Sequence, residues 1–405
     1  MDSRALADGF DLTDLPDDFH DDPYRYYRAL REHAPVKRMP DGSLFLTRHS
    51  DLVAVYKDTE TFSSDKKKEF APKFGVSTPL YEHHTTSLVF NDPPLHTRVR
   101  RIIAGAFTPR HIQAMERGLR DVVERLLDDI AERGTVDLID DYAGVITVEI
   151  IGNLLAVPRA ERGHLREWSL AILGALEPVP GAKALERGNR AVTQMLEYLT
   201  GLVGRRRARP GNPDSDVLTR LIQGDAPGDR LSMPELLHNC IFLLNAGHET
   251  TTNLIGNGLA TLWGHADQRA VLRSQPEAIK TGVEELLRFE SSNQLGNRIS
   301  TRAARIGDLP VSADTRITLC IGAANRDPEQ FADPDRLDIL RTPNRHLAFA
   351  SGAHQCVGMN LARLEGRIAI GRFVARFPAY RPAGPAVRGR RARFRGYLHL
   401  PFAVA

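Results

Sequence analysis

Apolar residues recur every three or four positions through most of the chain, which is the spacing that buries one face of a helix. Proline, glycine and capping residues mark where these periodic segments stop. The expected helices cover residues 94–106, 110–133, 142–155, 159–174, 186–208, 213–223, 232–263, 265–274, 277–290 and 359–377. A chain with this pattern is expected to be mainly α.

Short β segments are predicted on either side of these helices. Residues 36–48 alternate in polarity around Pro40-Asp41-Gly42, which is typical of a hairpin, and further strands are expected near 298–320 and 394–404. Residues 62–89 lack any period and predict a long loop, which at this length is usually functional. We therefore expect a smaller β-rich region and a loop that covers a pocket.

Charge and composition exclude some classes of protein. The chain has 405 residues, and 54 Lys and Arg against 51 Asp and Glu give a net charge of +3, too balanced for a protein whose main partner is a nucleic acid. The amino terminus carries acids where a signal peptide would be basic and then apolar, and no 18-residue apolar run occurs. A cytoplasmic protein without a membrane partner is expected.

One of the three cysteines lies in a setting that favours chemistry. Cys356 stands in a glycine-bearing loop just before a predicted helix, where backbone N–H groups lower the pKa of a thiol and glycines let a flat ligand approach. Cys240 and Cys320 fall on apolar positions of a helix and a strand and are expected to be packing residues. The wide spacing of the three argues against a disulfide framework, a zinc site or an iron–sulfur cluster.

The residues around Cys356 form a longer pattern. Phe349, Gly352, His354, Cys356 and Gly358 together resemble the haem-binding signature of the cytochrome P450 family. The resemblance implies that Cys356 is the axial ligand of the iron in haem b, iron protoporphyrin IX. The sequence departs from the family at the residue after the phenylalanine, which is often glycine there and is Ala350 here.

Two further motifs agree with this resemblance. Glu285 and Arg288 lie three apart on a predicted helix, where a surface ion pair is the simpler interpretation; in the family such a pair is structural and buried beneath the haem. The segment from Ala246 and Gly247 to Glu249 and Thr250 resembles the oxygen-binding part of the family's central helix. It implies that the small pair lets the helix lie against the haem, that Thr250 positions oxygen and water, and that Glu249 delivers protons.

Four residues are implied as partners of the haem propionates. His96 and Arg100 lie one turn apart on a helix whose expected N-cap is Asp92. Arg298 and His354 match the family's propionate-binding positions on a strand and in the cysteine loop. Cationic and hydrogen-bonding groups of this kind hold carboxylates.

The resemblance covers nearly the whole chain, and it implies the cytochrome P450 fold with residues 1–405 as a single, monomeric domain. That fold has a large helical region, a smaller β-rich region and haem between the helix of Thr250 and the helix after Cys356. The implied reaction inserts one atom of O2 into a small organic substrate. Since the sequence contains no flavin or iron–sulfur module, electrons from NAD(P)H would arrive through a separate ferredoxin and its reductase.

Other functions remain open. The protein could be a peroxygenase that uses H2O2, although such an enzyme has no need of Glu249 and Thr250, or a non-catalytic haem-based sensor or ligand-binding protein. Substrate contacts are left open for three polar residues, Asn245, Asn293 and Gln294, and Asn245 could instead orient Glu249. The basic cluster at 388–395 is interpreted as surface charge. The arginines near the cysteine-side face are either a docking patch for an acidic electron carrier or ordinary surface residues, namely Arg98, Arg101, Arg363 and Arg367.

Overall fold

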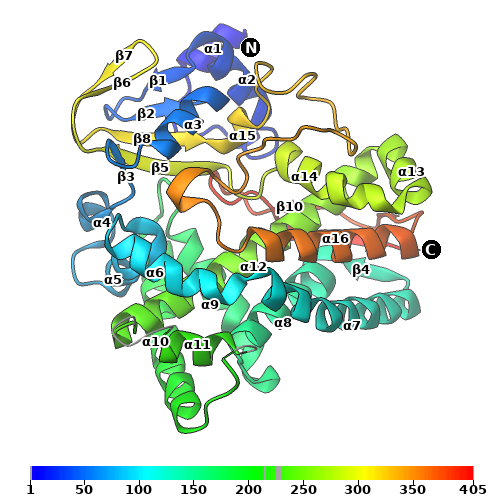
Figure 1. The fold of residues 1–405 in the computed structure, drawn as a ribbon. Coiled ribbons are helices and arrows are strands. Elements are labelled where there is room, and N and C mark those ends of the chain that lie inside the picture. Colours follow the sequence, from blue (N-terminus) through cyan, green and yellow to red (C-terminus); the bar gives the residue numbers. More distant parts are fainter. Residues whose placement is uncertain (1, 214–215, 225–229, 405) are drawn as a thin grey trace.

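The computed structural model describes residues 2–213, 216–224 and 230–404, and it confirms a mainly helical chain with a smaller β-rich region (Figure 1). No helix within these described ranges is both long and apolar enough to cross a membrane. The α-helices are α1 (Ser3–Asp8), α2 (Tyr24–His33), α3 (His49–Lys57), α4 (Lys67–Phe74), α5 (Pro79–Thr86), α6 (Leu95–Ala104), α7 (Pro109–Arg133), α8 (Gly144–Leu154), α9 (Leu165–Gly174), α10 (Ala182–Ala208), α11 (Val217–Gln223), α12 (Met233–Gly264), α13 (Ala266–Ser274), α14 (Ile279–Phe289), α15 (Ile321–Ala324) and α16 (Met359–Arg376).

The long helix α12 is the centre of the helical region. It begins with a capping box, in which the Ser232 side chain accepts from the backbone N–H of Glu235 and the Glu235 carboxylate accepts from the backbone N–H of Ser232. Most of its residues are buried, because α5, α8, α9, α10, α14 and α16 pack around it. The predicted long helices are confirmed to within a few residues; the segment predicted at 213–223 includes residues 214–215, which lie outside the description.

The β-rich region is built on a five-stranded sheet with the order β1-β2-β8-β5-β3. The predicted hairpin is confirmed, since β1 (Val36–Arg38) pairs antiparallel with β2 (Leu44–Leu46). β8 (Arg316–Cys320) lies parallel to β2 and antiparallel to β5 (Leu295–Ser300), and β3 (Phe62–Ser63) closes the edge. This sheet matters for the site because β5 carries its residues toward α12.

The smaller sheets come mostly from the last third of the chain. β6 (Ala304–Ile306) and β7 (Leu309–Val311) form a hairpin, and β10 (Val387–Arg388) pairs with β11 (Tyr397–His399). β12 (Pro401–Ala403) lies between β4 (Thr135–Asp137) and β9 (Arg381–Pro382). The strands predicted near 298–320 and 394–404 are thereby confirmed.

The prediction of a long loop at 62–89 is wrong, because β3, α4 and α5 fill most of this stretch. Helix α5 has a regular start, with Thr78 accepting from the backbone N–H of Tyr81 and Pro79 in the first turn. Its buried face includes His83 and His84, which count as polar residues in a hydrophobicity pattern. The helical period was concealed because part of the buried face is polar, and because α4 contains Pro72.

The expected N-cap of α6 is also wrong. The cap residue is Pro94, and no side chain caps the helix. Asp92 instead accepts hydrogen bonds from the Ser63 hydroxyl and from the backbone N–H of Ser64, the latter at 2.9 Å. Asp92 therefore ties α6 to the end of β3, a long-range contact that a local pattern does not reveal.

Candidate active site

A cavity of about 330 Å³, called the main cavity below, is lined by α12 and by the loop that carries Cys356. Its wall also receives side chains from α5, α6, β5 and the segment 393–394. The predicted site residues that line it are His96, Arg100, Ala246, Gly247, Thr250, Arg298, Phe349, His354, Cys356 and Gly358. The structure thus brings together ten of the predicted residues, and Glu249 and Gly352 lie outside this wall.

The cysteine loop is held by its backbone. The N–H of Cys356 donates to the Phe349 carbonyl at 2.9 Å, and Gly358 directly precedes helix α16. Gly352 has φ of +69°, and a Cβ there would meet the Tyr56 carbonyl oxygen at 2.4 Å, so this position requires glycine. Gly352 supports the loop from outside the cavity.

The environment of the Cys356 thiol differs from the expectation of a lowered pKa. Burial raises the pKa of Cys356, and the backbone N–H of Gly358 and the charges of Arg100 and Arg363 lower it only in part. The helix start alone therefore does not give Cys356 a lowered pKa.

Ala350 marks where the chain departs from the family's usual glycine. Its φ is +55°, in the left-handed region, where side chains other than glycine are disfavoured by about 1–2 kcal/mol. The backbone conformation that glycine would serve is therefore kept in this chain, and an alanine adopts it.

Helix α12 presents Ala246, Gly247 and Thr250 to the main cavity. The Thr250 hydroxyl donates to the Ala246 carbonyl at 2.5 Å, so its oxygen is left with lone pairs to accept a hydrogen bond. A Cβ on Gly247 would meet Cδ1 of Ile151 at 2.7 Å. A side chain at Gly247 would therefore press on the end of the Ile151 side chain of α8, in addition to entering the cavity wall.

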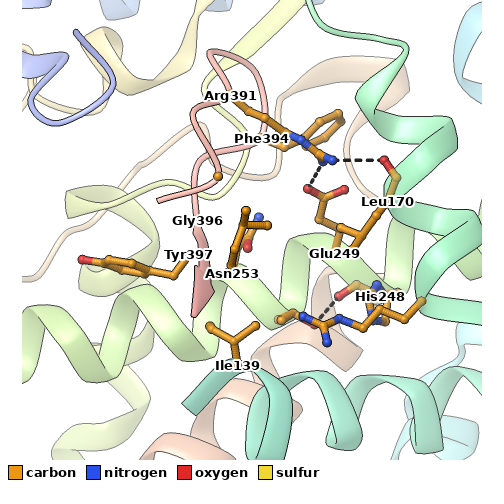
Figure 2. A pocket seen from close by; sticks show the side chains of 13 residues that line it. Ile139, Leu170, His248, Glu249, Asn253, Arg391, Phe394, Gly396 and Tyr397 are labelled. Carbon is orange, nitrogen blue, oxygen red and sulfur yellow. Dashed lines mark hydrogen bonds and ion pairs between the residues drawn. The ribbon is translucent and has the colours of Figure 1, made fainter. Parts of the chain in front are cut away.

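Glu249 lies outside the main cavity and lines a second, smaller pocket, called the side pocket below (Figure 2). Its carboxylate forms an ion pair with Arg391, which also donates to the Leu170 carbonyl at 3.0 Å. Burial raises the pKa of Glu249 to about 7, and Arg391 opposes this rise. Glu249 is therefore a buried acid that can exchange a proton near neutral pH.

The interpretation of residues 388–395 as surface charge is wrong for three of the arginines. Arg391 pairs with Glu249, and Arg395 is 6% exposed and pairs with Glu290. Arg393 lines the main cavity and donates to the Leu295 carbonyl at 2.9 Å. The carboxylate partners of Arg391 and Arg395 lie more than a hundred residues earlier in the sequence, so the neighbouring residues do not reveal them.

One end of the main cavity fits the two carboxylates of a haem. His96 Nε2, Arg298 Nε and His354 Nε2 are buried, line this cavity with their residues, and have no hydrogen-bond partner among the described residues. The imidazole rings of His96 and His354 are in contact, with centroids 3.9 Å apart and planes tilted by 33°, and Arg100 donates to the Gln355 carbonyl at 2.5 Å beside them. Buried polar atoms without partners are rare, and propionate oxygens would satisfy these. The residues present therefore fit the group.

Glu285 and Arg288 form a fully buried pair, which confirms the structural interpretation of this motif. Arg288 donates to both carboxylate oxygens of Glu285 at 2.7 Å, and Arg341 donates to the same carboxylate at 3.1 and 3.2 Å. Arg288 also donates to the Asn325 and Pro334 carbonyls. The pair therefore fastens α14 to the long segment that leads to the cysteine loop.

A buried acid that the sequence analysis does not identify lines the main cavity. Glu365, on α16, is 3% exposed, lines the cavity and forms a hydrogen bond with Thr251. Burial raises the pKa of Glu365 to about 8. The available signal was an acid on the otherwise apolar face that holds Leu361 and Ile368.

Of the three polar residues considered as substrate contacts, two line the main cavity and one does not. Asn245 and Asn293 line the main cavity, whereas Gln294 donates to the Ser291 carbonyl at 2.6 Å and lies outside it. The Asn245 side-chain oxygen accepts from Ser169 at 2.8 Å, so Asn245 does not orient Glu249.

Comparison with known proteins identifies relatives of this chain over nearly its whole length. The cytochrome P450 family model matches residues 274–382. The 6-deoxyerythronolide B hydroxylase of Saccharopolyspora erythraea is 36% identical over 408 residues, which is 96% of this chain and 99% of the relative. The vitamin D(3) 25-hydroxylase of Pseudonocardia autotrophica is 36% identical over 365 residues, 89% of this chain and 87% of the relative. The crystal structure of P450BioI with an acyl carrier protein that carries hexadec-9Z-enoic acid superposes with a TM-score of 0.90, at 32% identity and 96% and 100% coverage.

The fold and the cysteine-containing cavity define a haem-thiolate enzyme. The chain belongs to the cytochrome P450 family, and it is a monooxygenase that acts on organic substrates with O2 and redox partners.

Proposed function

We propose that residues 1–405 form one haem b monooxygenase domain whose iron is held by Cys356 and whose electrons come from NAD(P)H through a separate ferredoxin and reductase. One observation carries this proposal. The wall of the main cavity contains Cys356 and Thr250 together with three further residues. These are His96, Arg298 and His354, each of which has a buried polar side-chain atom without a hydrogen-bond partner among the described residues. A metal ligand, an anion site and an oxygen-handling alcohol are the three parts that the reaction needs.

The protein's own residues would hold the haem in two ways. Cys356 would supply the sulfur ligand of the iron, and His96, Arg100, Arg298 and His354 would bind the two propionates. Ala246, Phe349 and Ala362 would form apolar contacts with the ring, since all three line the cavity. Once bound, the haem supplies reductive activation of O2 and the insertion of one oxygen atom into the substrate.

Proton supply would fall to α12. The Thr250 oxygen, whose own proton is engaged by the Ala246 carbonyl, would accept a hydrogen bond from water in the main cavity and fix its position. Glu249, one residue earlier and turned toward the side pocket, would take up protons there and pass them across the helix. The two residues line different cavities, and a relay between them must pass through water.

Reduction of the purified haem protein tests the electron route without knowledge of the substrate. We expect NADPH, ferredoxin reductase and ferredoxin together to produce the carbon monoxide difference spectrum, and omission of ferredoxin to slow its appearance at least tenfold. Turnover with H2O2 alone that exceeds turnover with the complete NADPH system would instead establish the peroxygenase alternative. If the haem protein oxidises no organic probe with either system, a sensor or ligand-binding protein would be favoured.

The ion pair between Glu249 and Arg391 leads to a prediction about pH. Because Arg391 lowers the pKa of Glu249, the Arg391→Gln variant should raise that pKa further above its present value of about 7. The limb of the pH profile that reports Glu249 should therefore move to higher pH, by about one unit or more. The measurement is ferredoxin-driven NADPH oxidation as a function of pH.

Arg390 offers a matched control, since this exposed neighbour pairs with Asp17 at the surface. The Arg390→Gln variant should leave the profile in place, and Glu249→Gln should remove the limb altogether. The nearby charges of Glu177 and Arg166 remain in all three variants. An unchanged profile in Arg391→Gln would show that Glu249 does not control the proton supply.

A further inference from the structure

Three buried histidines form a cluster beside the main cavity, and two of them line its wall. His83 and His84 come from α5 and are each 2% exposed, and His238 comes from α12 and is 6% exposed. The ring centroids of His83 and His84 are 4.8 Å apart, and those of His83 and His238 are 5.7 Å apart. His83 and His84 line the same cavity as Cys356 and Thr250, whereas His238 packs behind them and does not line it.

None of the three imidazoles has a hydrogen-bond partner among the described residues. His83 Nδ1, His84 Nε2 and His238 Nδ1 are buried ring nitrogens without a partner. Buried polar groups in proteins are nearly always hydrogen-bonded, so an exception calls for a ligand or water that completes the site. Since two of these rings face the cavity, a molecule bound there is positioned to supply the partner.

The charge state of the rings limits what they can bind. Burial lowers the pKa of His83 far below its ordinary value and lowers the pKa of His84 to about 3, with help from the nearby charges of Lys73 and Arg393. Both rings are therefore neutral, and each offers one N–H donor and one nitrogen acceptor. A neutral ring of this kind matches a hydroxyl or a carbonyl and gives a carboxylate no counter-charge.

The two cations beside the rings are already engaged with the protein. Lys73 donates to the carbonyl of Glu177 at 2.7 Å, and Arg393 donates to the carbonyls of Leu176 and Leu295. The neighbouring wall is apolar, with Leu173, Leu176, Leu88, Phe90, Phe242 and Leu243. A polar subsite in an apolar wall is the usual arrangement for orienting a largely apolar ligand.

We propose that His83 and His84 form a subsite for an uncharged oxygen-bearing group, a hydroxyl or a carbonyl, of an otherwise apolar substrate. The inference rests on the proposed function, because it names the class of molecule that the monooxygenase takes. The relatives' names indicate different substrates, 6-deoxyerythronolide B and vitamin D3, so the substrate of this chain follows from its own cavity wall. His238 contacts the His83 ring but does not line the cavity, so it is not part of the subsite.

Binding of four probes with one carbon skeleton tests the subsite: cyclododecanol, cyclododecanone, cyclododecane and cyclododecanecarboxylic acid. Dissociation constants would be measured on the haem-loaded enzyme from the spin-state shift, and by calorimetry for probes that bind without a shift. We expect the alcohol and the ketone to bind about tenfold more tightly than the hydrocarbon, the size of one well-formed hydrogen bond in a buried site, and more tightly than the acid.

Phenylalanine variants remove the ring nitrogens and keep the aromatic packing of His84 against Phe70, Phe74 and Phe90. His84→Phe and His83→Phe should reduce the preference for the alcohol and the ketone to about onefold. His84→Gln, which restores a donor and an acceptor, should recover part of it. His238→Phe is the matched control, because it alters the same cluster outside the cavity and should keep the preference.

Three outcomes would overturn the subsite: an equal preference in wild type and in the double His83→Phe, His84→Phe variant, a tighter complex with the acid, or no binding of the alcohol and the ketone to wild type. Failure of the proposed function would be seen elsewhere. It would appear as loss of the thiolate signature in the carbon monoxide spectrum or as no reduction by ferredoxin, and neither readout depends on His83 or His84.

Discussion

The Cys356→Ala variant is expected to lose the strongly red-shifted Soret band that the reduced wild-type protein should show with carbon monoxide. The reason is that Cys356 supplies the only described sulfur among the residues that line the main cavity, and the red shift depends on thiolate coordination. All ferredoxin-driven NADPH oxidation should disappear with it. The measurement is the difference spectrum of dithionite-reduced protein, wild type beside variant, at equal haem content.

The other two cysteines provide the control. Cys240 and Cys320 are buried, and burial raises the pKa of each to about 12, as expected for inert packing thiols. Cys240→Ala should keep the red-shifted band with at most a small loss of stability. A wild-type protein without this band, even after reconstitution with haem, would contradict the assignment of Cys356 and the proposed reaction together.

The Glu285→Gln variant is expected to lower the free energy of unfolding by about 3–5 kcal/mol, the cost of breaking a buried pair by removing one partner. Arg288 and Arg341 would then face each other without the carboxylate that both now contact. A loss of this size is a large part of the ~5–15 kcal/mol that holds a typical domain together. Thermal unfolding of the haem protein, followed by circular dichroism, would show the fall in Tm.

A second glutamate on the same stretch of chain serves as the matched control. Glu277 pairs with Lys280 at the same three-residue spacing, but both side chains are largely exposed. Solvent screens such a pair, so Glu277→Gln should leave the Tm unchanged. Similar Tm values for the Glu285→Gln and Glu277→Gln variants would mean that the buried network does not fasten α14 to the cysteine segment.

Most of the helical framework could be predicted from the sequence because its signals are local. Helix α12 carries a capping box at Ser232 and Glu235, and α7 starts after Thr108 with Pro109 in its first turn and ends at Gly134. The cysteine loop could be predicted because its residues are close together in the chain. Both cases depend on neighbours within a few residues, which is what a single sequence displays.

The errors share another physical origin, since they concern contacts between distant segments. Asp92 was expected to cap α6 and instead binds Ser63 and Ser64. Glu249 pairs with Arg391, 142 residues later in the chain, while Thr250, turned by about 100° on the same helix, faces the main cavity. Neither partner can be identified from the residues next to it in sequence.

The basic segment at 388–395 is among the last parts of the chain to be synthesised. Ribosomes release a chain from its amino terminus, so Tyr56 and His96 are available long before Arg393 and Phe394 complete the same cavity wall. Until the segment at 388–395 emerges, the carboxylates of Glu249 and Glu290 also lack the arginines that pair with them. The wall of the main cavity is therefore completed only at the last stage of synthesis, and a chain stalled before that segment would lack Arg393 and Phe394.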